Sequence, residues 1–236
     1  MAKKYKNLNW ILLGLFGVFL LFNQFQLSGL SDTTGSIWEV GSLSQSISLF
    51  SGNDDYDLSD VDVTEIESTA QGIALLFPVD EIETTEDAIA MMVPTGTPEY
   101  GEAMGVSFDD AQGSLDLMEN AYYVTLANYK QDEELWARYV NLASNPRGIS
   151  CEYCCGINAH AVTTEGVSMC GCAHNPALQL VTLWLMDNTD YSDAEILREV
   201  YRWKSLWFPQ KMVGLAIEIS GGNTDVLALP GMVGGC

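Results

Sequence analysis

The chain has 236 residues, and its 32 Asp and Glu residues outnumber ten Lys and Arg residues, which gives a formal net charge of −22. No Lys or Arg occurs between Asn7 and Tyr129, so more than half of the chain is strongly anionic. Nucleic-acid binding requires Lys and Arg to neutralise phosphates, and the composition therefore excludes nucleic acid as a partner.

Residues 1–27 are predicted to form an N-terminal transmembrane anchor. An uncharged apolar run extends from Trp10 to Phe22 and follows Lys3, Lys4 and Lys6. Positive charge before an apolar segment favours a cytoplasmic N-terminus, which predicts a single-pass protein of the cell membrane with an extracytoplasmic C-terminal domain. The run is shorter than the about 20 residues that usually cross a bilayer. A cleaved secretory signal, with a small-x-small site at residues 29–31, is the alternative, and it also exports the chain.

Residues 28–75 are predicted to form an acidic stalk, because Ser, Gly, Thr, Asn and Asp dominate without a helical or strand period. A helical domain is expected over residues 76–236. In the segment from Gln71 to Tyr100 three prolines interrupt the apolar clusters, which favours extended pieces or one short helix.

The first two predicted helices lie in the middle of the chain. Apolar residues recur at spacings of three and four from Ala111 to Tyr129, after a cap at Ser107 or Asp109. A second helix with the same pattern is expected to start at Asp132.

Two further helices are predicted after residue 174. Asn175 is expected to cap the third, with Pro176 at the first helical position. Ser192 and Glu195 have the spacing of a capping box for the fourth, and Pro209 is expected to end it. The predicted fold is therefore mainly α, a bundle of about four helices after the transmembrane helix and the acidic linker.

Cysteine and histidine are concentrated in one short segment. Five of the six cysteines and both histidines lie between residues 151 and 174, in the strings CEYCCG and CGCAH and at one position between them. The candidate metal ligands are Cys151, Cys154, Cys155, His160, Cys170, Cys172 and His174. A C-x-x-C turn lets two thiolates converge on one ion, and a second close pair can complete the coordination. The free N–H groups of the helix after His174 would also favour thiolates over thiols.

The ligand types do not identify the metal. Soft thiolates select zinc, cuprous copper or iron–sulfur clusters, and two imidazoles favour zinc or copper(I) over iron–sulfur. Zinc is narrowly preferred. Cys236, at the end of a Gly-rich tail, is expected to be separate from the cluster.

Two alternatives remain open for the cysteines. Six cysteines could form three disulfides in an exported scaffold or interaction domain. A C-x-x-C pair at Cys151 and Cys154 could also exchange electrons with substrate thiols, although the alternating strands and helices of thioredoxin-like proteins are absent from the pattern.

Four strings of the chain carry a resemblance. They are GVSFDDA at 105–111, SCEYCCG at 150–156, CGCAHN at 170–175 and YSDAEILREVYRWKSLWFP at 191–209. On these strings the chain resembles a group of uncharacterised, membrane-anchored prokaryotic proteins. The CGC followed by His is distantly similar to exported proteins named for a PCYCGC motif, although the leading Pro-Cys-Tyr is missing here. The resemblance implies an exported domain with a cysteine motif and assigns no activity.

Overall fold

The computed structural model describes residues 56–153, 156 and 159–221. The chain divides into two compact units, residues 1–49 and 50–236, and the described residues all belong to the second. The predicted anchor, residues 1–27, lies outside the described part. No helix in the described ranges is long and apolar enough to cross a membrane.

The described unit is mainly α, as predicted. Between residues 56 and 221, as far as they are described, there is no β-strand, and a single antiparallel bridge joins Val162 to Ser168. The helices are η2 (Val63–Glu65), α3 (Thr69–Leu76), η3 (Val79–Glu81), α4 (Thr85–Met92), α5 (Gly101–Met104), α6 (Ala111–Tyr129), α7 (Glu133–Ala143), α8 (His174–Asn188), α9 (Asp193–Trp207) and α10 (Pro209–Ser220).

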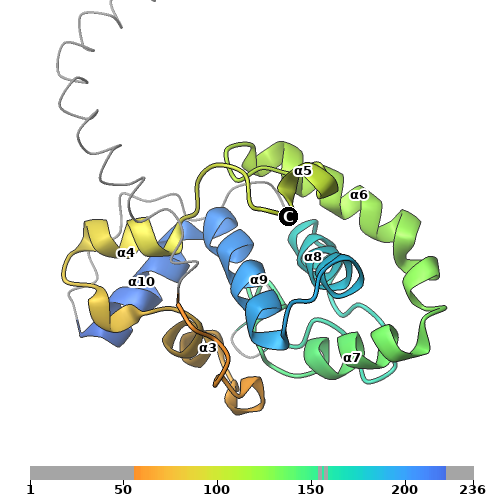
Figure 1. Cartoon of the computed structure of the whole chain (residues 1–236), viewed down its shortest axis with the longest axis horizontal. Coiled ribbons are helices and arrows are strands. Elements are labelled where there is room, and N and C mark those ends of the chain that lie inside the picture. The colour runs from red at the N-terminus through yellow and green to blue at the C-terminus, as the bar shows by residue number, and fades with distance from the viewer. Residues whose placement is uncertain (1–55, 154–155, 157–158, 222–236) are drawn as a thin grey trace, which may run out of the picture. The chain divides into compact units, whose positions relative to one another are not determined.

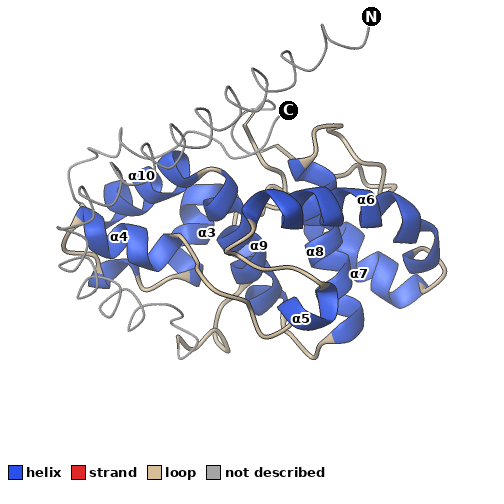
Figure 2. Ribbon diagram, turned by 90° about the horizontal axis from the view of Figure 1, so that it is seen from above, coloured by secondary structure: helices blue, strands red, loops and turns tan. Residues whose placement is uncertain are grey.

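Helix α9 lies between two groups of helices. Helices α3, α4 and α10 pack on one side of it, and α6, α7 and α8 lie on the other (Figures 1 and 2). Helix α8 packs against α6, α7 and α9, and each of its residues from 174 to 183 is buried. This burial explains why its sequence is apolar nearly all round. The predicted helical bundle is confirmed, with α8 and α9 at its centre.

Local capping signals set several helix starts. The Ser192 hydroxyl accepts from the Glu195 backbone N–H, and the Glu195 carboxylate accepts from that of Ser192, which is the predicted capping box. Asp132 caps α7 as predicted. The start of α6 differs from the prediction, because the side chain that accepts from its first turn is that of Asp110.

The bundle contains more helices than the four predicted. The proline-rich segment before residue 100 forms α3, α4 and most of the connection to α5, because each proline falls between helices. Pro209 ends α9 as expected, but it is also the first residue of α10, where its missing N–H leaves no hydrogen bond unmade. Helix α8 begins at His174 with Ala173 at the N-cap, so the predicted cap at Asn175 is wrong and Pro176 is the third residue of the helix, within its first turn.

Residues 56–75, within the segment predicted to be a stalk, pack against the helices. Leu58, Val63 and Ile66 are buried, and α3 contacts α9 and α10. The boundary predicted at residue 75 falls inside α3. The described part of this segment therefore contributes to the core.

Candidate functional site

Three cysteines from the two predicted strings lie together. Cys151 follows the loop after α7, and Cys170 and Cys172 lie directly before α8. The sulfur of Cys172 lies 3.6 Å from that of Cys151 and 3.5 Å from that of Cys170. All three thiols are free, since a disulfide bond is only about 2.05 Å long.

The two histidines differ in their surroundings. His174, the first residue of α8, is fully buried and packs edge-on against Trp207. The centroids of the His174 and Phe208 rings lie 4.7 Å apart. Its side chain hydrogen-bonds Cys172. His160 is exposed to solvent, outside this buried group. The geometry therefore brings one of the two histidines to the thiols.

These side chains do not by themselves make a finished metal site. Within the described ranges, no group of three or more His, Cys, Asp and Glu side chains is arranged so that it could hold a metal ion. Among the three thiols, the Cys172 sulfur contacts the other two. Cys154 and Cys155, the remaining predicted ligands, lie outside the described residues.

The thiols have different acidities. The hydrogen bond with Cys172 lowers the pKa of Cys151, with help from the Lys204 charge and against the effect of burial. The same hydrogen bond, together with burial, raises the pKa of Cys172 to about 11. Cys151 is therefore the first of this pair to become a thiolate.

Comparison with known proteins assigns no function to this site. No family model, curated protein or solved structure matches the chain. Its function must be inferred from the site itself.

A buried ion pair lies beside Cys151. The Glu152 carboxylate accepts from the Lys204 ammonium at 3.2 Å and from the Thr69 hydroxyl, and the Lys211 ammonium lies 3.6 Å from the same oxygen. Lys204 also donates to the Gly148 carbonyl. Burial by itself would raise the pKa of Glu152, but Lys204, Thr69 and Lys211 together hold it below its usual value.

This ion pair was missed by the sequence analysis. A signal was present, because Lys204 lies four residues after Val200 and three before Trp207, on the buried face of α9. A lysine on such a face needs a carboxylate partner. The sequence does not indicate which of the many acidic residues it is.

A second polar network supports the other string. The hydroxyls of Tyr122 and Tyr139 both donate to the Gln179 side-chain carbonyl, and the Gln179 amide donates to the Ser168 hydroxyl. The Asn175 amide donates to that hydroxyl and to the Cys170 carbonyl. Helices α6, α7 and α8 thereby hold the segment that carries Cys170.

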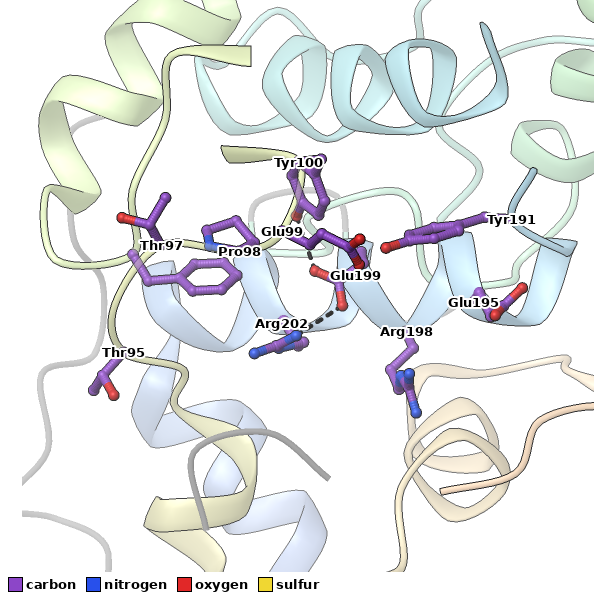
Figure 3. A pocket seen from close by; sticks show the side chains of 11 residues that line it. Thr95, Thr97, Pro98, Glu99, Tyr100, Tyr191, Glu195, Arg198, Glu199 and Arg202 are labelled. Atoms are coloured by element: carbon purple, nitrogen blue, oxygen red, sulfur yellow. Dashed lines mark hydrogen bonds and ion pairs between the residues drawn. The ribbon is translucent and has the colours of Figure 1, made fainter. Parts of the chain in front are cut away.

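A separate polar pocket lies along α9. It has a volume of about 280 Å³ and is lined by Arg198, Arg202, Glu199 and residues of the loop before α5 (Figure 3). Within it Arg202 pairs with Glu199 at 2.9 Å, and Tyr100 donates to the same carboxylate. These contacts hold the loop on α9, and the pocket contains none of the predicted site residues.

Proposed function

We propose that this chain is a membrane-anchored extracytoplasmic protein whose helical domain binds a transition metal ion through a Cys/His cluster. The observation that supports the proposal most directly is the contact of the Cys151 and Cys170 sulfurs with Cys172, across the two separated strings. The ion is either structural or cargo.

The sulfur spacing fits thiolate coordination. Zn–S bonds are about 2.3 Å long, so two sulfurs on one tetrahedral zinc ion lie about 3.8 Å apart. The contacts of 3.5 and 3.6 Å are a few tenths of an ångström shorter. Each of these two sulfur pairs needs only a small adjustment to share an ion, whereas a disulfide would require the two sulfurs of a pair to come about 1.5 Å closer.

The remaining ligands are assigned from the sequence and from position. We propose Cys154 and Cys155 as further thiolates, since they follow Cys151 by three and four residues in the C-x-x-C-C string. His174 either ligates the ion or donates its ring N–H to the Cys172 thiolate, the role that outer-shell groups have around metal thiolates. His160 is the weakest candidate because it is exposed. Zinc is preferred, and copper(I) is the alternative because both accept thiolate and imidazole.

The test is metal analysis of the purified full-length protein. Elemental analysis should find about one equivalent of zinc or copper, as expected of one Cys/His site. The number of thiols that react with a dithionitrobenzoate reagent should rise after chelation. Cys172→Ser should abolish metal retention.

The matched control is Cys236→Ser. Cys236 lies outside the described residues and is predicted to be separate from the cluster, so this variant should retain the metal. A metal-free wild-type protein whose cysteines remain unreactive until it is treated with a reductant would refute the proposal in favour of a disulfide scaffold.

Thiol–disulfide exchange is a second candidate, favoured by one observation. The lowered pKa of Cys151 and its contact with Cys172 would allow a reversible disulfide. However, Cys151 is fully buried, which restricts attack on a protein substrate. Catalysed reduction of a test disulfide by the wild-type protein, lost in Cys151→Ser, would support this function instead.

A further inference from the structure

Glu152 has an unusual backbone conformation next to the first cysteine. Its φ is +56°, and no other non-glycine residue in the described part of the chain has a positive φ. An L-residue in this region is strained and persists only where surrounding contacts impose it. Strain of this kind often marks a functional constraint.

The contacts that impose this conformation come from three helices. Thr69 at the start of α3, Lys204 in α9 and Lys211 in α10 all bind the carboxylate of Glu152, and Lys211 also donates to its backbone carbonyl. The Lys204 and Glu152 side chains are 0% and 1% exposed. A buried ion pair of this kind is weak evidence for stability, because desolvation offsets most of the attraction. The better-attested role of a buried ion pair is to fix one geometry of the groups around it.

The charges around Glu152 do not cancel. Two ammonium groups face one carboxylate, which leaves an excess of one positive charge beside Cys151 in a chain of net charge −22. A zinc or copper(I) ion bound by several thiolates is an anionic complex. A nearby fixed cation in a site of reduced dielectric stabilises such a complex.

We propose that Glu152, Lys204 and Lys211 form a clamp that positions Cys151 against Cys172 and supplies one positive charge to balance a thiolate-bound metal. The charge-balancing part rests on the proposed metal binding. The positioning part concerns the metal-free protein and is tested separately.

Positioning is tested by alkylation of the folded, metal-free full-length protein with iodoacetamide, read by peptide mass spectrometry. Cys151 should be protected in the wild type. In Glu152→Gln and Lys204→Met it should react at least tenfold faster, because the loop is no longer held. Val200→Ala, in the core one turn earlier on α9, is the control for general destabilisation and should leave Cys151 protected under conditions where the protein is folded.

Charge balance is tested with a lysine that is partly exposed. Lys211 is 29% exposed, so its removal should leave the fold intact. Lys211→Met should weaken zinc affinity, measured by competition with a chromophoric chelator, by roughly three- to tenfold. Lys211→Arg keeps the positive charge and should retain the zinc affinity of the wild type. Lys130→Met removes the same charge from the C-terminal end of α6, where Lys130 lies over the Trp136 ring, and should change the affinity by less than about twofold, as expected of a screened charge.

The outcomes of these experiments distinguish the positioning role from the charge-balancing role. Unchanged protection of Cys151 in both Glu152→Gln and Lys204→Met, or equal loss of protection in Val200→Ala, would overturn the positioning role. Equal affinities for Lys211→Met and Lys130→Met would overturn the charge-balancing role. If the wild type binds no metal, the proposed function and the charge-balancing role both fail, while the alkylation result still decides the positioning role.

Discussion

The sulfur atoms of Cys151 and Cys172 lie 3.6 Å apart although 21 residues separate them in the chain. The segment between them turns back on itself, where Val162 pairs with Ser168 and the Met169 N–H donates to the Ala161 carbonyl. This turn returns the second string to the first. The clamp and the Gln179 network hold the two ends.

Removal of metal should lower the thermal stability of the wild-type protein. A ligand that binds only the folded state stabilises it by about 4 kcal/mol when its free concentration is a thousand times its Kd. We expect a chelator to lower the Tm by several degrees, measured by differential scanning fluorimetry. Cys172→Ser should already show the lower Tm and should not respond to the chelator. An identical Tm for the wild type with and without chelator would contradict metal binding.

The Glu152 ion pair should make stability sensitive to acid. The pKa of Glu152 is lowered in the folded state from an ordinary value of 4.5, so its contribution is fully present above pH 4.5 and is lost as the pH falls through the folded value. Glu152→Gln should cost about 3 kcal/mol at neutral pH, because it leaves a buried ammonium without its counter-charge. The cost should shrink at low pH. Urea unfolding of both proteins between pH 3 and 7 measures this difference, and a cost independent of pH would be inconsistent with an ionised Glu152.

Gln179→Leu should destabilise the protein by about 2–4 kcal/mol, because the buried hydroxyls of Tyr122 and Tyr139 would lose their acceptor. Chemical denaturation measures the loss. Gln112→Leu on the exposed face of α6 is the matched control and should change stability by less than about 0.5 kcal/mol. Similar values for the two variants would show that the Gln179 network does not support the fold.

Gly72→Ala should destabilise α3 although Ala is the better helix former. An added Cβ would overlap the ring of Tyr201, which is fully buried and cannot move away. Overpacking of this kind costs about 1–3 kcal/mol and outweighs a propensity gain of about 1 kcal/mol. Gly171→Ala, between Cys170 and Cys172, has open space around the added atom and should be neutral. A stabilising effect of Gly72→Ala in thermal unfolding would contradict the close packing of Tyr201.

Local features of the chain predicted much of the bundle. The caps at Asp132 and at Ser192 with Glu195 were predicted because each depends on residues within one helical turn. The sequence predicts Pro209 only as a helix end, whereas Pro209 also begins α10, since a proline that ends one helix can equally begin the next. The sequence predicts extended pieces or one short helix where α3 and α4 form, because each of these helices has only eight residues, too few for a sustained period.

The sequence by itself determined the helical class, the anionic surface and the two strings that hold the cysteines, because these follow from composition and short-range periodicity. Only the tertiary structure decided that Cys172 contacts both Cys151 and Cys170, that His174 is buried while His160 is exposed, and that Glu152 pairs with Lys204. The reason is that any of 32 acidic residues could pair with the buried lysine, and each of the six cysteines could lie beside any of the others. Packing of α3, α9 and α10 around one loop selects among them.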